Sequence, residues 1–221
     1  MAEFKLRKGY DIPLAGAAAK DVVDAPKPAT VALKPTDFRG VKYRLLVNEG
    51  DAVKVGTPLV RSKSREDWRF ASPASGTVKA IVRGRRRVLE AIIIEPDAEP
   101  QYESFTSYEP AQLAGLSKAD ALTLLLEAGM LHLFRQRPYD LAANPDDEPR
   151  DIFISGFDTA PLAADTAIIL AGNEAAFQAG LDVCSTLTRG QVHLAARPQA
   201  PAAISDAKNV DIADEKPVSS V

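Results

Sequence analysis

Short stretches of alternating apolar and polar residues, separated by turn residues, fill the first hundred positions of the chain. Gly50 with Asp51 forms one candidate turn and Gly56 opens the next, because glycine reaches backbone angles that other residues resist. Between these turns Val53 and Val55 alternate with polar residues, which is the period of a half-buried strand. The alternation returns further along, at Val78, Ala80 and Val82. Short strands at this spacing predict a small all-β barrel or sandwich over residues 1–100, with an N-terminal strand near residues 9–16.

The two halves of this pattern, residues 50–59 and 73–78, resemble the biotinyl/lipoyl carrier fold. The resemblance covers residues 40–94 and implies a barrel-sandwich hybrid. Carriers of this type present a modifiable lysine at the tip of a hairpin, flanked by methionine or by aspartate and alanine. Lys63 is the lysine in the corresponding loop, but it sits early in that loop and lacks those neighbours. We expect Lys63 to be an ordinary solvated lysine, with a carrier modified on Lys63 as the alternative.

A basic turn follows the carrier-like region. Four arginines occur within five residues, at positions Arg83, Arg85, Arg86 and Arg87. Arginine forks bind oxyanions bidentately, so this turn could contact phosphate, an anionic lipid or an acidic partner. The alternative is a solvated turn that limits strand pairing at the edge of the sheet.

The apolar pattern changes its period after residue 100. Residues 101–116 are acidic and interrupted by proline, and we interpret them as a linker. Ser117 is a candidate helix N-cap, and Asp120 follows it at the spacing of a capping box. The apolar residues that follow have helical spacing and would form one face of that helix: Ala121, Leu122, Leu125 and Leu126.

Residues 117–200 indicate an α/β domain. The run 151–157 reads as a buried strand that ends at Gly156, and 167–170 reads as a further short strand. A helix over 174–188 and a strand over 192–195 complete a βαβ-like unit with a parallel sheet. The composition changes after Arg197, and we interpret residues 201–221 as a connector or a truncated end.

Composition excludes several classes of function. The net charge of −3 argues against general affinity for nucleic acid, and no apolar run is long enough to span a bilayer. The charged start of the chain suggests a cytoplasmic protein. Cys184 is the single cysteine, and His132 and His193 are the two histidines, so a metal or iron–sulfur site on this chain is not expected. We expect Cys184 and His132 to be packing residues, and His193 to point out from its strand.

Four segments spread over most of the chain are similar to the A subunit of the sodium-translocating NADH:quinone oxidoreductase, a bacterial respiratory enzyme. They follow one another in the order found in that family, at residues 8–16, 49–56, 71–76 and 157–165. The resemblance implies a barrel-sandwich hybrid followed by a Rossmann-like α/β domain similar to the flavin-binding subunit of complex I. Members of the family are about twice as long, so this chain is expected to be either a fragment of such a protein or a shortened form.

The resemblance also implies a function. It points to a peripheral subunit on the cytoplasmic face of the membrane, in a complex that oxidises NADH, reduces ubiquinone and exports sodium ions. The flavins and the iron–sulfur centre of that complex are expected on other subunits, and neither flavin nor NADH is expected on this chain, which has no glycine-rich phosphate-binding segment. A contact with quinone would need an apolar slot with one or two hydrogen-bond donors. The end of the 151–157 strand is the candidate region, at Phe157, Asp158 and Thr159.

Two other hypotheses stay open beside this one. The first is the carrier protein modified on Lys63. The second is a component of the related Rnf-type electron-transport complex, whose corresponding protein carries cysteine clusters in its later part. The single cysteine of this chain argues against the second hypothesis.

Overall fold

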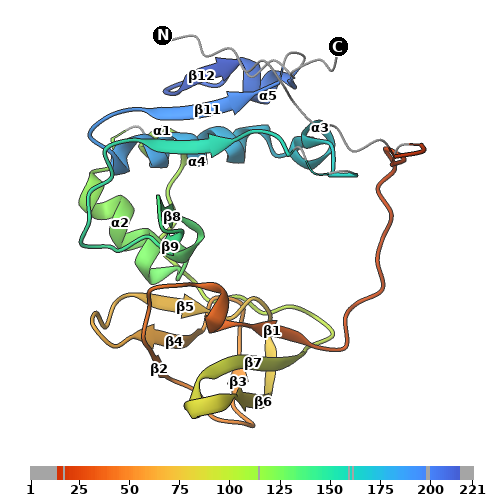
Figure 1. The fold of residues 1–221 in the computed structure, drawn as a ribbon, viewed down its shortest axis with the longest axis vertical. Helices are drawn as coiled ribbons and strands as arrows, with labels where there is room; N and C mark the ends of the chain where they lie inside the picture. Colours follow the sequence, from red (N-terminus) through yellow and green to blue (C-terminus); the bar gives the residue numbers. More distant parts are fainter. Residues whose placement is uncertain are drawn as a thin grey trace. The chain divides into compact units, whose positions relative to one another are not determined.

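A computed structural model (Figure 1) describes residues 14–16, 18–113, 115–158, 160, 162–197 and 200–214. These residues form two compact units. The barrel unit comprises Ala25–Tyr108 and Ser117–Asp147. The α/β unit comprises the described residues of three segments, up to Asp24, from Glu109 to Leu116 and from Glu148 onward.

The barrel unit contains two larger antiparallel sheets and a separate two-stranded one near residues 135–142. The four-stranded sheet has the order β1-β7-β6-β3, and the three-stranded sheet has the order β2-β4-β5. Their strands are β1 (Val31–Leu33), β2 (Tyr43–Leu45), β3 (Ala52–Val53), β4 (Pro58–Ser62), β5 (Arg69–Ala71), β6 (Gly76–Arg83) and β7 (Leu89–Pro96). The core contains fully buried side chains from both sheets, among them Leu59, Val60, Phe70, Ile92 and Ile94. The expected barrel-sandwich hybrid is therefore confirmed.

The helix predicted after Ser117 is present and belongs to the barrel unit. Its bounds are α2 (Lys118–Glu127), and the Ser117 hydroxyl accepts a hydrogen bond from the backbone N–H of Asp120. It is followed by η3 (Leu131–Leu133), β8 (Arg135–Gln136) and β9 (Leu141–Ala142). Leu126 and Leu131 are buried in the same core as the barrel strands. The structure therefore groups residues 117–147 with the barrel, whereas the sequence pattern placed them in the second domain, because sequence periodicity does not show what an apolar helix face packs against.

The α/β unit contains a parallel sheet of order β10-β11-β12. Its strands are β10 (Ile152–Ser155), β11 (Val192–Ala196) and β12 (Asp211–Asp214), and its helices are α1 (Pro110–Leu113), α3 (Thr166–Leu170), α4 (Glu174–Leu187) and α5 (Ala202–Ser205). Leu181 of α4 and Ile204 of α5 pack with Leu194 of β11 to form the core of this unit. The expected α/β domain and its helix near 174–188 are confirmed.

Other sequence-based interpretations also need correction. The run 167–170 is not a strand but lies in helix α3, where Asp165 caps the first turn by accepting a hydrogen bond from the N–H of Ala167. Residues 201–214 are not a connector, because they form α5 and β12, and β12 pairs with β11. The supposed linker 101–116 contains helix α1 and a bridge between Val55 and Tyr102.

One face of the parallel sheet packs against helices α4 and α5 and forms the core of the α/β unit, whereas the opposite face holds the exposed side chain of Phe153. Ile154, Leu194 and Ile212 contribute to the core with α4 and α5. The residues between them in sequence point to the other face, and there Phe153 is 73% exposed and stacks on His193 at 4.8 Å between ring centres. The prediction of a buried strand over 151–157 is therefore wrong for the face that carries Phe153, although parallel sheets are usually covered on both faces.

Candidate functional site

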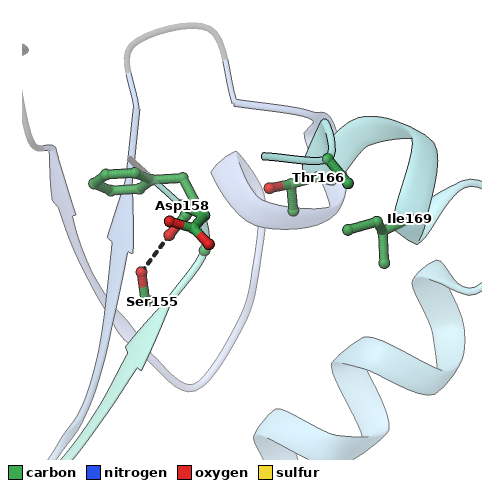
Figure 2. Close-up of a pocket in the computed structure, with 7 residues that line it drawn as sticks. Ser155, Asp158, Thr166 and Ile169 are labelled. Atoms are coloured by element: carbon green, nitrogen blue, oxygen red, sulfur yellow. Dashed lines mark hydrogen bonds between the residues drawn. The ribbon is translucent and has the colours of Figure 1, made fainter. Parts of the chain in front are cut away.

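A cavity of about 550 Å³ lies at the carboxyl end of strand β10 in the α/β unit. This is the edge at which open parallel sheets usually bind ligands. Figure 2 shows Ser155 and Asp158 at the end of the strand, with Thr166 and Ile169 on helix α3 at the other side of the cavity. The complete lining is Ser155, Gly156, Phe157, Asp158, Ala164, Thr166 and Ile169.

Hydrogen bonds fix the strand side of the cavity. The Ser155 hydroxyl donates to the backbone carbonyl of Phe157 at 2.6 Å, and a carboxylate oxygen of Asp158 accepts from the N–H of Ala160 at 2.8 Å. Arg197, just after β11, donates to the backbone carbonyl of Asp158 at 2.6 Å. Its guanidinium carbon also lies 4.9 Å from the centre of the Phe157 ring. Arg197 therefore holds the loop through a hydrogen bond and a cation–π contact.

A glycine is required where the strand turns into the cavity. A Cβ atom on Gly156 would lie 2.7 Å from the backbone oxygen of Ala195, which is closer than real Cβ atoms come to other heavy atoms. The N–H of Gly156 donates to that same oxygen at 2.9 Å. The close approach of β10 and β11 at this point leaves no room for a side chain.

The helix side of the cavity depends on Asp165. Its carboxylate caps α3 and also forms a 2.8 Å ion pair with Lys20 from the N-terminal part of the unit. The hydrogen bond from Lys20, followed by the one from Ala167, lowers the pKa of Asp165, while Asp165 raises the pKa of Lys20. These contacts position the first turn of α3, which carries Thr166 into the lining.

The lining combines an apolar surface with a few polar groups. Phe157, Ala164 and Ile169 supply apolar contact, and Ser155 and Thr166 supply hydroxyls. No histidine or cysteine is among the lining residues, so the lining itself offers no nucleophile–base pair of that kind. Within the described ranges, no group of three or more metal-ligating side chains lies close enough together to hold an ion. The arrangement can bind a small, partly apolar molecule.

Three residues form the candidate quinone region predicted from the sequence, and two of them lie in this cavity. Phe157 and Asp158 both line it, whereas Thr159 lies outside the described residues. Sequence reasoning missed Thr166 and Ile169, because it assigned their segment to a strand, and it missed Arg197. The Asp165–Thr166 pair ahead of an apolar run was the available signal, since aspartate is a favoured N-cap.

The other candidate residues lie in the barrel unit. Lys63 is exposed between β4 and β5, and its backbone N–H donates to the carbonyl of Lys42. The arginines of the basic turn are all exposed at the tip of the β6–β7 hairpin. Residues 9–13 of the expected N-terminal strand lie outside the described residues.

His132 and Cys184 are packing residues, as predicted. The His132 ring lies 4.4 Å from the centre of Phe38 and 5.1 Å from that of Phe70. Burial lowers the pKa of His132, and its Nδ1 atom is buried without a hydrogen-bond partner. Burial on helix α4 likewise raises the pKa of the Cys184 thiol.

Two family models match the chain, in the same order as the two predicted domains. The NqrA N-terminal barrel-sandwich hybrid domain matches residues 4–97, and the NqrA second alpha/beta domain matches residues 116–216. The chain belongs to the NqrA family. The second NqrA model begins near α2, so the family boundary and the compact units of the structure divide residues 117–147 differently.

Individual NqrA relatives agree with this assignment. The chain is 40% identical over 193 residues to the A subunit of the Na(+)-translocating NADH-quinone reductase of Hahella chejuensis, covering 87% of this chain and 43% of the relative. It is 41% identical over 192 residues to the protein of the same name from Serratia proteamaculans, covering 86% and 42%. The Yersinia pestis protein of that name is 40% identical over 190 residues, with 86% and 42% covered. The chain thus spans less than half the length of these curated relatives.

Among the described residues, no helix combines the length and the apolar character that crossing a bilayer requires.

Proposed function

We propose that this chain acts as the NqrA component of a Na(+)-translocating NADH-quinone reductase, peripheral on the cytoplasmic face of the membrane and bound to the other subunits of the complex. The observation that carries the proposal is the match to both NqrA domains in family order, together with about 40% identity to named relatives over most of the chain. In this proposal the complex couples NADH oxidation and quinone reduction to sodium export, and the chain contributes a docking or quinone-associated role.

The proposal assigns the redox centres to other subunits. Flavin, NADH and an iron–sulfur centre each need recognisable groups, such as a glycine-rich phosphate loop or several cysteines. The sequence has a single cysteine and no such glycine-rich loop. The three relatives compared above are reductase subunits by name, which does not favour the carrier or the Rnf-type alternative.

The cavity at the end of β10 is the proposed quinone-associated region. A quinone head group is a flat, largely apolar ring with two carbonyl acceptors, so it needs an apolar slot and a nearby donor. The Phe157 and Ile169 side chains provide apolar contact, and the Thr166 hydroxyl can donate. The Asp158 carboxylate is itself an acceptor, so the head group would lie toward α3 and away from Asp158.

A reconstitution experiment tests the assignment to the complex. The tagged chain is mixed with detergent-solubilised membranes that contain the sodium-translocating reductase but lack its own NqrA, and the captured material is assayed for flavin absorbance and sodium-stimulated NADH:quinone activity. We expect a flavin-containing reductase to co-purify with the chain. Failure to capture it, also when the chain is extended to the length of its relatives, would contradict the assignment.

Variants in the same assay test the cavity. Ile169 is 58% exposed, so Ile169→Gln removes apolar contact without cutting into the core, and Phe153→Gln is the matched change of an exposed apolar residue outside the cavity. We expect Ile169→Gln to raise the KM for a short-chain ubiquinone about 10-fold, and Phe153→Gln to leave it unchanged, because one lost apolar contact is worth about 1–3 kcal/mol. Equal capture but unchanged KM for both variants would remove quinone from this cavity and leave the docking role.

A further inference from the structure

The tip of the β6–β7 hairpin has an unusual backbone for its sequence. The turn is closed by a hydrogen bond from the N–H of Gly84 to the carbonyl of Val88 at 2.9 Å. Within it, the N–H of Arg87 donates to the carbonyl of Gly84 at 3.1 Å and the N–H of Val88 to the carbonyl of Arg85 at 3.4 Å. Arg86 and Arg87 have φ angles of 58° and 60°, and these are the left-handed values that a type I′ turn needs at both central positions. Asn-Gly is the preferred pair there, because arginine has a Cβ that disfavours this conformation.

The arginine side chains at this tip point into solvent and do not contribute ion pairs to the described part of the fold. Arg83, Arg85, Arg86 and Arg87 are all exposed, and none of them forms an ion pair with a described residue of the chain. The carboxylate of Glu90 lies beside Gly84, where a Cβ would otherwise be. The fold therefore accepts an unfavourable backbone at two arginines whose charges form no ion pair with the part of the chain that the structure describes.

Exposed apolar residues flank the arginines. Val82 is 37% exposed and Val88 is 49% exposed, one on each side of the turn. A turn that combines several unpaired guanidinium groups with exposed aliphatic side chains has the composition of surfaces that bind at the membrane interface, where lipid phosphates meet hydrocarbon.

We propose that this tip, residues 82–88, binds the surface of a membrane that contains anionic lipids. The arginine forks would contact lipid phosphates, and Val82 and Val88 would enter the interfacial layer. A hairpin tip is convex, and neither of the two cavities lined within residues 155–169 and within residues 185–211 includes a residue of this tip. A convex tip fits a broad, fluid surface better than a specific acidic peptide. The net charge of the whole chain is −3, so attraction to an anionic surface has to come from a local patch such as this one. The inference is independent of the proposed role in the reductase.

The test measures co-sedimentation of the 221-residue chain with vesicles of phosphatidylcholine alone and of phosphatidylcholine mixed with phosphatidylglycerol. The decisive variant is Arg86→Asn/Arg87→Gly, which removes two charges and installs the preferred type I′ pair. The variant therefore keeps the hairpin, so that lost binding cannot be ascribed to unfolding. Arg44→Gln/Arg69→Gln is the matched control, because it removes two exposed arginines from other strands of the same unit.

We expect binding to the mixed vesicles only, with a partition coefficient that falls about 25-fold in Arg86→Asn/Arg87→Gly, at about 5-fold for each arginine, and that is little changed in the control. Binding should also weaken as salt is added. Three results would overturn the proposal: no binding to mixed vesicles, an equal loss in the control variant, or displacement from vesicles by inorganic phosphate at equal ionic strength. The last result would mean that the turn recognises soluble phosphate.

Discussion

At the scale of single residues, His132 is a titratable group whose surroundings differ clearly from water. Its ring packs against both Phe38 and Phe70. Burial lowers the pKa of His132 from 6.5 and outweighs a backbone hydrogen bond with Gly129 that raises it, and the Arg135 charge adds a smaller decrease. The folded state therefore favours the neutral ring, while the unfolded chain binds a proton more readily. By linkage, the neutral His132 ring contributes fully to the stability of the barrel unit above pH 6.5. This contribution should decrease as the pH falls below 6.5, because the unfolded chain then binds a proton more readily than the folded one.

The measurement is urea unfolding followed by the fluorescence of Trp68, the single tryptophan, which lies 5.9 Å from Phe70 between ring centres. His132→Phe keeps a flat ring in the stack and removes the titration. We expect it to change stability at about pH 7.5 by less than about 1 kcal/mol and to abolish the decrease between about pH 6.5 and about pH 5. Asp67, whose pKa is lowered from 3.8 mainly by its hydrogen bond with Arg65, titrates below this window and so does not interfere. An identical decrease in the variant would show that another group is responsible.

At the scale of elements, the sequence could predict the helices and strands whose signals lie within their own residues. Strand β6 follows from alternation bounded by turns, and α2 follows from its cap and its apolar face. Helix α3 and strand β12 could not be predicted in this way. Ile168, Ile169 and Leu170 fit a strand or a helix equally well, and β12 becomes a strand only by pairing with β11. For the same reason the strand-edge rule located Phe157, whereas Arg197 reaches the site through a non-local contact.

The pairing of strand β6 with strand β7 depends on Gly76, the first residue of β6. Its φ is +150°, and a Cβ there would lie 2.0 Å from the backbone oxygen of Glu95 on the neighbouring strand. We expect Gly76→Ala to destabilise the barrel unit by about 3 kcal/mol, because backbone has to move to accept the methyl group. The measurement is the urea midpoint of Trp68 fluorescence.

The control is Gly50→Ala, at a turn whose φ is +91° but which has open space around it. That change should cost only the backbone preference, about 1 kcal/mol. If the two variants lower the urea midpoint by the same amount, the backbone near Glu95 moves away from the added methyl group at no extra cost. That result would also mean that the register of β6 against β7 does not depend on Gly76.

At the scale of the whole molecule, each unit carries its own single reporter. Trp68 is the single tryptophan and lies in the core of the barrel unit, while Cys184 is the single cysteine and lies on α4 of the α/β unit. Thiol labelling of Cys184 and fluorescence of Trp68 can therefore follow the unfolding of the two units in the same sample. The two cores share no residue among those described.

Matched core truncations use these reporters. Leu59 and Ile204 are fully buried, one in each core, so Leu59→Ala and Ile204→Ala should each cost about 3 kcal/mol. We expect Leu59→Ala to lower only the denaturant midpoint seen by Trp68, and Ile204→Ala only that seen by Cys184 labelling. A common shift of both midpoints would mean that the units unfold as one.

The outcome decides how the functional variants can be interpreted. The basic turn belongs to the barrel unit and the cavity at β10 belongs to the α/β unit. If the units unfold separately, a loss of vesicle binding with an unchanged Trp68 midpoint must come from the turn itself. Likewise, a raised KM for quinone with unchanged Cys184 labelling must come from the cavity. If the units unfold together, each binding measurement needs both reporters before an effect can be assigned to either site.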